Sequence, residues 1–416
     1  MVILLTLQYS RFVASPTVMI VERNYFDWNI SYPAITLCPL YKPDIIKFGK
    51  FVNDTNNITG LNMRGFLWAI AHAALDTLSY LDLNLPTEVQ LIEPKNYAKV
   101  AANMFREFEE GWFASNTNKV MSVDATMTEM GMCHVINSNV AIFDRPFNWN
   151  RVNTTADTYV KKNMDISIFE ADFVTIITDY ASIYKVFIHD PDEVTMTTGS
   201  SFTFDVEGVV SFGLSVWSTR ISEELRYKSL RIRKCRFNHE PISKRYPVYS
   251  FNHCILECRI KMILRICGCV PHFYKPLSYE RICNIPELKC VLKHRKEIIT
   301  LKSSEETFKQ FCNIKDLPRI SRDCGCLNSC ELDMYYKDNE DFLYQKGLNK
   351  LKIKITSFPK VRVVRDVIFS FYDIVLRSGG VVNLCIGSSL ISLVELLLVI
   401  LKCILYFPIR AIRSIY

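Results

Sequence analysis

The chain has 416 residues, 22% of them charged, and a formal net charge of +7. This length allows about two or three average domains with a sizeable core. The positive charge is weak and scattered, which argues against a nucleic-acid partner. The densest basic run, residues 226–245, is interpreted as a solvated strand and loop, with an anion- or lipid-binding surface as the alternative.

The N-terminus begins with a short apolar run, Met1 to Leu7. Seven residues are too few to span a bilayer. One interpretation is a signal peptide cleaved near Ala14 and Ser15, although it lacks a basic leader. The other is the outer end of a transmembrane helix that begins upstream, and both remain open at this point.

Hydrophobic periodicity predicts a mixture of helices and strands along the next 350 or so residues. An apolar stripe at helical spacing is assigned to core packing; it consists of Leu67, Ile70, Ala71, Ala74, Leu75 and Leu78. The predicted elements are a buried strand at 32–38, helices at 63–81 and 94–113, a sheet with hairpins over 166–217, a helix at 249–266 and a half-buried strand at 351–355. We therefore predict one continuous α+β body without repeats or long linkers.

Cysteines and glycosylation signals indicate an oxidising, extracellular location for this body. The chain has 15 cysteines, and eleven of them lie in the segment from Cys235 to Cys330. Four Asn-x-Ser/Thr sequences occur, at Asn29, Asn53, Asn57 and Asn153.

A zinc site is the competing interpretation of the cysteines. It would use Cys267, Cys269, His272 and Cys283, or alternatively Cys324, Cys326 and Cys330. Structural zinc sites usually contain two cysteines separated by two residues, whereas these pairs are separated by one. Disulfides are therefore the favoured prediction, and no metal is expected.

The C-terminal part contains 21 residues, Val381 to Leu401, with a single formal charge at Glu395. As a helix this segment would reach roughly 30 Å, the thickness of the hydrocarbon core of a bilayer. Ser388, Ser392 and Glu395 would then share one face. An ionisable residue in such a span usually marks an ion path. Small residues also serve helix packing in membranes, so pore lining and packing both remain open.

Several motifs together resemble the degenerin/epithelial sodium channel family, most closely its insect pickpocket branch. The resemblance covers nearly the whole chain. Its motifs are YPAITLC at 32–38, GMCHVIN at 131–137, RKCRF at 233–237, Tyr249-Ser250 with Cys254 and Cys258, CGC at 267–269 with Pro271, CGCLNSC at 324–330, and GSSLISLVE at 387–395.

The resemblance implies an architecture. Members are homo- or hetero-trimers in the plasma membrane, with two membrane helices and a large extracellular domain per subunit. That domain has a β-sheet palm, a helical finger and a disulfide-rich thumb. The expected divisions are a remnant of the first transmembrane helix at 1–13, an extracellular domain at 14–375 with its thumb at about 235–335, a second transmembrane helix with the pore at 376–407, and a cytoplasmic tail at 408–416.

The resemblance also implies site residues. The expected disulfides are Cys235–Cys330, Cys254–Cys326, Cys258–Cys324, Cys267–Cys290 and Cys269–Cys283, which leaves Cys38, Cys133 and Cys312 unassigned. Gly387, Ser388 and Ser389 match the selectivity filter, which in the family is extended rather than helical. Ser392 and Glu395 would line the pore, with the three Glu395 carboxylates of a trimer forming a ring.

The chain departs from the family pattern in two places. The N-terminal cytosolic region and its His-Gly gating motif are not present before Met1, so we expect an N-terminally truncated or alternative start. Asn383 and Cys385 stand before the filter where relatives usually have Gly and a large apolar residue.

The function expected from the resemblance is a pore-forming subunit of a sodium-selective, amiloride-sensitive channel, with Na⁺ as permeant ion and no cofactor. The alternatives are a non-conducting modulatory subunit and a single-pass, disulfide-rich receptor or adhesion protein. An enzyme is not expected, because the sequence has no phosphate-binding loop, HExxH or GxSxG motif. Glu107, Glu109 and Glu110 are interpreted as a solvated helix end, with acid sensing as the alternative.

Overall fold

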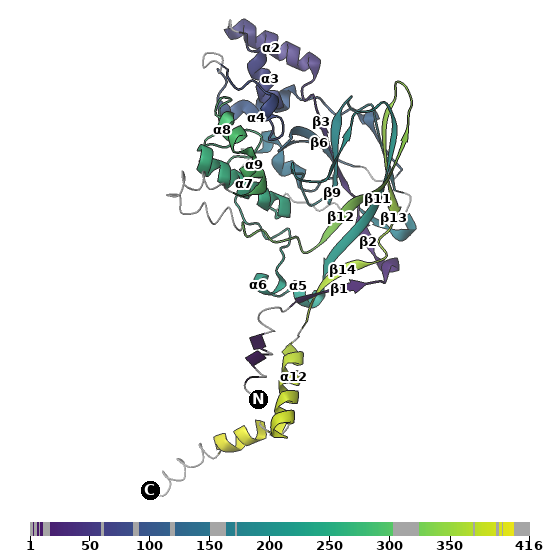
Figure 1. The fold of residues 1–416 in the computed structure, drawn as a ribbon, viewed down its shortest axis with the longest axis vertical. Coiled ribbons are helices and arrows are strands. Elements are labelled where there is room, and N and C mark those ends of the chain that lie inside the picture. Colours follow the sequence, from purple (N-terminus) through teal and green to yellow (C-terminus); the bar gives the residue numbers. More distant parts are fainter. Residues whose placement is uncertain are drawn as a thin grey trace. The chain divides into compact units, whose positions relative to one another are not determined.

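A computed structural model shows the chain as two compact units (Figure 1). The structure describes residues 3, 6–7, 9–10, 17–59, 62–85, 91–116, 121–149, 164–170, 173–302, 324–368, 371–387, 391–392 and 394–402. The larger unit contains residues 22–219 and 235–362, and the smaller unit contains residues 1–21, 220–234 and 363–416. The two units are described separately below.

The larger unit is built around the long strand β11 (Gly208–Ile221). β11 pairs antiparallel with β12 (Leu332–Leu343) and parallel with β13 (Asn349–Ser357). Beyond β13 lie β8 (Val174–Thr178) and then β4 (Phe113–Ser115), each antiparallel to its neighbour. On β13 the apolar positions at 351, 353 and 355 are buried, which confirms the predicted half-buried strand.

A second sheet of five strands faces the first. Its order is β10 (Ser201–Phe204), β9 (Tyr184–His189), β3 (Ala34–Pro39), β6 (Gly131–Ile136) and β5 (Val123–Thr128). A separate pair is formed by β2 (Asn29–Ser31) and β7 (Asp165–Ser167). Apolar residues of both sheets share one core, in which Leu37 and Val186 of the second sheet meet Ile177 and Phe212 of the first.

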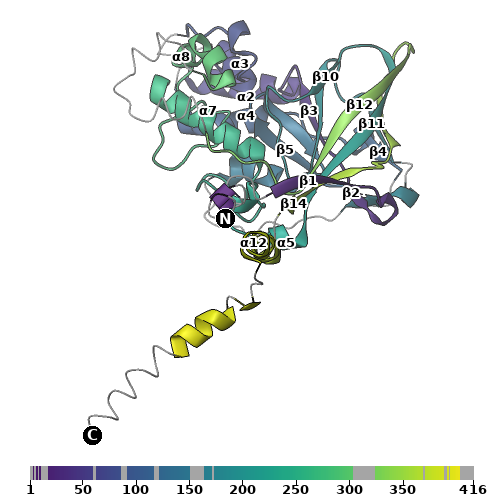
Figure 2. The same cartoon turned by 60° about the horizontal axis from the view of Figure 1, so that its bottom comes forward.

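The helices of the larger unit lie together on one side of the sheets (Figures 1 and 2). They are α2 (Ile45–Thr59), α3 (Arg64–His72), α4 (Tyr97–Met104), α7 (Phe251–Cys267), α8 (Leu288–Lys293) and α9 (Arg295–Thr300). They share a second core, which includes Leu67, Tyr97, Ile260 and Leu288. Helices packed to one side of largely antiparallel sheets confirm the predicted α+β class.

Two predicted helices are shorter than expected. The helix predicted at 63–81 ends at His72, because the Leu75 N–H donates to the carbonyl of Glu129 at 2.8 Å. The Thr77 hydroxyl also donates to the carbonyl of His72, at 2.6 Å, and so supplies a hydrogen-bond donor to the last carbonyl of the helix. The helix predicted at 94–113 ends at Met104, and residues 113–115 form β4 instead. The predicted apolar stripe is nevertheless buried throughout.

The smaller unit contains β1 (Thr17–Glu22), α5 (Glu223–Arg226), α6 (Leu230–Arg233), β14 (Arg362–Val367) and α12 (Phe371–Ile386). β1 and β14 are paired. The Arg365 guanidinium joins β14 to the end of α6, since its Nη1 donates to the carbonyls of Arg233 and Lys234 at 2.8 and 2.9 Å. The segment at 220–234 is therefore tied to the strand that leads into α12.

Candidate functional site

The helix α12 ends inside the C-terminal apolar stretch, immediately before the predicted filter. Its last residue is Ile386, and Gly387 follows with a φ of 72°. The Gly387 N–H donates to the carbonyl of Asn383 at 2.8 Å, which closes the last turn. A left-handed residue at this point is the usual way to end a helix, and glycine adopts it without steric cost.

One uninterrupted helix from Val381 to Leu401 is excluded by the helix end at Gly387, where the family resemblance implied a backbone that is not helical. Helical backbone is described again at 391–392 and 394–402. Within the described ranges, no helix combines the length and the apolar composition that crossing a bilayer requires. The expected single face of Ser388, Ser392 and Glu395 stays a prediction, because Ser388 lies outside the described residues.

The site residues that the structure describes here are Gly387, Ser392 and Glu395. Ser388 and Ser389 lie outside the described residues. Glu395 is exposed within a run of exposed apolar side chains, such as Ile391 at 71% and Leu398 at 61%. Such a run is too apolar to face water in a single chain, so lipid or other protein chains must cover it.

The disulfides of the segment 235–330 are organised by α7. Ser250 caps its N-terminus by accepting from the His253 N–H, and Gly268 ends it with a φ of 73°. Cys254 and Cys258, one turn apart, are bonded to Cys326 and Cys324, with Cα separations of 5.8 and 6.1 Å. The remaining pairs are Cys267–Cys290, Cys269–Cys283 and Cys235–Cys330. The structure thus brings together all five pairs that the family resemblance implies.

A sixth disulfide joins two cysteines that had no predicted partner. Cys38 on β3 is bonded to Cys133 on β6, with Cα atoms 4.5 Å apart. The register of these strands pairs Leu37 with His134, and one further step places the two cysteines opposite each other. Cys312, the third unassigned cysteine, lies outside the described residues.

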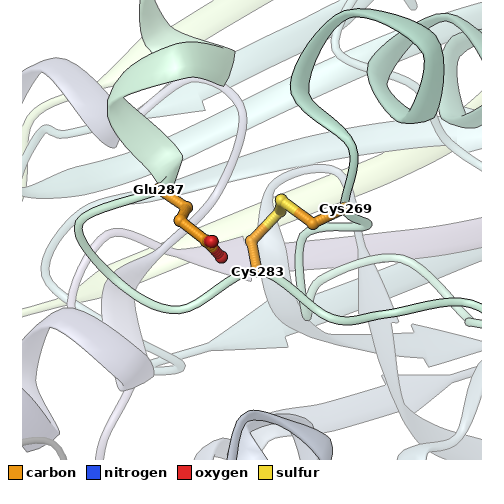
Figure 3. Close-up of side chains that lie close together, drawn as sticks. All are labelled: Cys269, Cys283 and Glu287. Carbon is orange, nitrogen blue, oxygen red and sulfur yellow. A yellow bond between two sulfur atoms is a disulfide. The ribbon is translucent and has the colours of Figure 1, made fainter.

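The cysteine geometry does not support the zinc alternative. Cys269, Cys283 and Glu287 lie close together (Figure 3), but the two sulfur atoms are bonded to each other and supply no thiolate. The Glu287 carboxylate accepts from Arg281 Nη1 at 2.7 Å. His272 is buried, and its Nε2 lies 3.0 Å from the carbonyl of Ile70. These residues hold the fold together and form no metal site.

Sequence reasoning missed the carboxylate that organises the start of α7. Glu193 is buried and accepts hydrogen bonds from the Ser250 hydroxyl at 2.6 Å and from the N–H groups of Phe251 and Asn252 at 3.0 and 3.1 Å. It also accepts from the Ser329 hydroxyl at 3.0 Å. A carboxylate at a helix N-terminus is stabilised by the helix dipole. Glu193 therefore links α7 to the residue preceding Cys330, a contact that only the tertiary structure reveals.

Three predicted glycan acceptors and the acidic residues at 107–110 are exposed, whereas the basic run 226–245, predicted to be solvated, buries Arg233 and Arg245. Asn29, Asn53 and Asn57 have exposed side chains, as a glycan acceptor requires, and Asn153 lies outside the described residues. Glu107, Glu109 and Glu110 are also exposed, and Glu107 pairs with Lys47 at 2.5 Å. Their exposure agrees with solvated side chains, but they do not form the predicted helix end, because α4 already ends at Met104.

Similarity to known proteins extends over most of the chain. The sequence model of the amiloride-sensitive sodium channel family matches residues 1–399. Sodium channel protein Nach of Drosophila melanogaster is 22% identical over 94% of this chain and 77% of its own length. Pickpocket proteins 11 and 28 of the same species are 25% and 22% identical over about half of this chain, and the alignments cover 41% and 36% of those proteins.

The family match extends from the first residues through both sheets, the disulfide-stapled segment and the interrupted apolar stretch. Because the match covers nearly the entire sequence, it is not confined to a single shared domain. The chain belongs to the amiloride-sensitive sodium channel family.

Proposed function

We propose that the chain is a pore-forming subunit of a sodium-selective cation channel that carries Na⁺ passively across the plasma membrane. Family membership supports a sodium channel subunit, and the helix end at Gly387 is the observation that carries the assignment of a pore. Irregular backbone within an apolar stretch is tolerated where it lines a water-filled path. This proposal includes sensitivity to amiloride.

In this proposal the filter is formed by Gly387, Ser388 and Ser389. The left-handed backbone of Gly387 directs the chain out of α12 and makes room for backbone and small polar groups to surround a cation. Ser392 and Glu395 line the pore beyond the filter. Three Glu395 carboxylates in a homo-trimer, or one from each copy of this chain in a hetero-trimer, would raise the local cation concentration.

The remaining assignments follow the same family architecture. The two sheets form the palm, the helices α2, α3 and α4 belong to the finger, and residues of about 235–335 form the thumb. Residues 376–407 form the second membrane segment, residues 1–13 belong to the first, and residues 408–416 form a cytoplasmic tail. Asn29, Asn53, Asn57 and Asn153 carry glycans on the extracellular side.

Whole-cell and single-channel recording of the native chain and of Glu395→Gln tests the proposal. The chain is expressed alone and together with a related subunit, in sodium and then in a large impermeant cation, with amiloride added at the end. We expect an amiloride-blocked sodium current whose single-channel conductance falls in Glu395→Gln, because the carboxylate ring loses its charge.

Glu109→Gln, at an exposed residue of the larger unit, is the matched control and should leave conductance unchanged. Surface labelling ensures that both variants reach the membrane. An unchanged single-channel current in Glu395→Gln would remove this residue from the pore. Surface-expressed protein that passes no current in any combination would instead favour a modulatory subunit or an anchored receptor.

A further inference from the structure

The larger unit contains a cavity of about 270 Å³ at the start of α7. It is bordered by the end of β9 and the residues that follow it, by the first turn of α7 and by the start of β12. Tyr336 at its edge is 52% exposed, so the cavity opens to solvent. Its volume lies near the lower end of the range for small-molecule sites.

The charge of the cavity wall is one-sided. Three buried carboxylates line it, those of Asp190, Glu193 and Asp333. Across the described part of the chain, no Lys or Arg contributes to this wall. His189 also lines the cavity, and burial lowers its pKa to about 4, so it is neutral at pH 7.

The three carboxylates are not equivalent. Glu193 faces the positive end of the α7 dipole and four hydrogen-bond donors, so its charge is largely compensated. Among the described residues, Asp190 accepts from two donors: its Oδ1 and Oδ2 accept from the N–H groups of Asp192 and Asp333, at 2.9 and 2.8 Å. A carboxylate offers about four acceptor positions, so Asp190 retains the capacity to bind a further donor.

Apolar and aromatic side chains form the rest of the wall. Phe187, Phe251 and Tyr335 supply aromatic surface, and Met196 adds a flexible apolar side chain. Thr195 lines the cavity too, and its buried hydroxyl has no hydrogen-bond partner among the described residues. Thr195 also borders a smaller cavity of about 20 Å³, which has room for one water. Carboxylates and aromatic faces both attract a cation, and such a wall disfavours an anion.

We propose that this cavity binds a small organic cation, an amine with an aromatic or aliphatic body. The ammonium group is placed beside Asp190, and the apolar body packs against Phe187, Phe251 and Tyr335. The site belongs to one subunit and lies in the larger unit, so it does not depend on the assignment of the pore.

Isothermal titration calorimetry on the purified full chain tests this site with three probes of the same shape. These are 2-phenylethylamine, which is cationic at pH 7.5, neutral 2-phenylethanol and anionic phenylacetate. We expect 2-phenylethylamine to bind at least about tenfold more tightly than the alcohol, and phenylacetate not to bind. Equal binding of all three probes, or no binding of the amine, would overturn the proposal.

Two variants locate the binding. Asp190→Asn keeps the size of the side chain and removes its charge, and it should weaken amine binding by about tenfold or more. Tyr336→Ala removes an exposed rim residue with little risk to folding and should weaken binding by about threefold. Tyr344→Ala, at an exposed residue just after the end of β12, is the matched control. If neither Asp190→Asn nor Tyr336→Ala changes the affinity, the amine binds elsewhere.

The pH dependence provides a second readout. Burial and the carboxylates of Asp192 and Asp333 raise the pKa of Asp190, whereas neighbouring His189 is neutral and Glu193 is held by the α7 N-terminus. A bound ammonium favours the ionised form of Asp190, so binding releases a proton. Amine affinity should therefore rise with pH in the native chain and become independent of pH in Asp190→Asn. The same slope in both proteins would show that Asp190 does not contact the amine.

Discussion

Lys42 is an ionisable residue in an apolar environment. It is only 4% exposed, and its Nζ lies 4.0 Å from the sulfur of Cys133. Burial lowers its pKa from 10.5 to about 7, an effect that Asp76 opposes and Lys185 reinforces. Burial also lowers the pKa of the adjacent His72 to about 4, so this histidine adds no charge near neutrality.

Replacing Lys42 by methionine should stabilise the protein. Between about pH 7 and 10.5 the unfolded chain binds more protons than the native one, so stability rises with pH across this window. Lys42→Met should raise the free energy of unfolding by about 2–4 kcal/mol at pH 6, and by less at pH 9, where native Lys42 is already neutral. Denaturant unfolding at both pH values measures the difference.

Lys185→Met serves as the matched control, because Lys185 is half-exposed and its Nζ pairs with Asp76 at 2.6 Å. This substitution should not stabilise the chain. A stabilisation by Lys42→Met that is the same at pH 6 and pH 9 would show that the cost of burying the amine is not electrostatic.

Arg259 and Glu129 form a fully buried ion pair between α7 and the β5–β6 turn. Their Nη1 and Oε2 atoms are 2.5 Å apart, and each residue is 1% exposed. Glu129 also accepts from the Tyr274 hydroxyl at 2.7 Å and from the Thr197 N–H at 2.9 Å. The pair therefore fixes four segments of the larger unit at one point.

Arg259→Met leaves Glu129 as a buried charge without its cation and should cost about 3–5 kcal/mol of stability. Adding Glu129→Gln removes that charge and should restore part of the loss. Chemical denaturation of the single and double variants measures both effects. If the double variant is less stable than Arg259→Met, the loss arises from packing and not from the unpaired carboxylate.

At the scale of elements, periodicity predicts burial better than it predicts helix ends. The stripe from Leu67 to Leu78 is buried as expected, yet its helix ends at His72 because Leu75 bonds to Glu129, a residue over 50 positions away. The missed helix α2 did leave a local signal. Asp44 caps it by accepting from the N–H groups of Ile46 and Lys47, both at 2.9 Å, and follows Pro43.

The end of β1 and the start of β14 are joined by one cluster. The Arg362 guanidinium lies 4.5 Å from the ring centre of Trp28, and its Nε pairs with Glu22 at 2.7 Å. Trp28 is only 5% exposed, so the stacked guanidinium is partly desolvated. In the proposed channel this cluster ties together the two chain segments that lead to the membrane.

Arg362→Ala should lower the stability of the larger unit by about 1–2 kcal/mol, since it removes both the stacking and the ion pair. Arg362→Lys should restore only part of this, because an ammonium cannot stack as a planar guanidinium does. Denaturant unfolding compares the two with Lys360→Ala, an exposed neighbour that should have no effect. Equal stability of Arg362→Lys and the native chain would assign the contribution to charge alone.

Across the whole molecule, the cysteines show what sequence alone can and cannot predict. The five bridges within 235–330 follow from closely spaced motifs and a family resemblance. The bridge between Cys38 and Cys133 depends on the register of two strands 95 residues apart, which no local pattern contains. The candidate pore shows a related limit: apolar composition suggests one helix, whereas the family resemblance implies an extended filter, and α12 ends at Gly387 through a single left-handed residue.

The Cys38–Cys133 bridge joins strands β3 and β6, outside the segment 235–330 that holds the other five bridges, so its contribution can be measured separately. Replacing both cysteines by serine should cost about 2–4 kcal/mol, because the unfolded chain regains the freedom of a 95-residue loop. Denaturant unfolding of the purified protein gives this difference. The single variant Cys38→Ser leaves Cys133 as a free thiol that is 0% exposed and should react with an alkylating reagent only when the chain unfolds. If that thiol reacts as fast in the native protein as in the unfolded one, strands β3 and β6 do not hold together without the bridge, and the disulfide would be a requirement for the sheet rather than an addition to it.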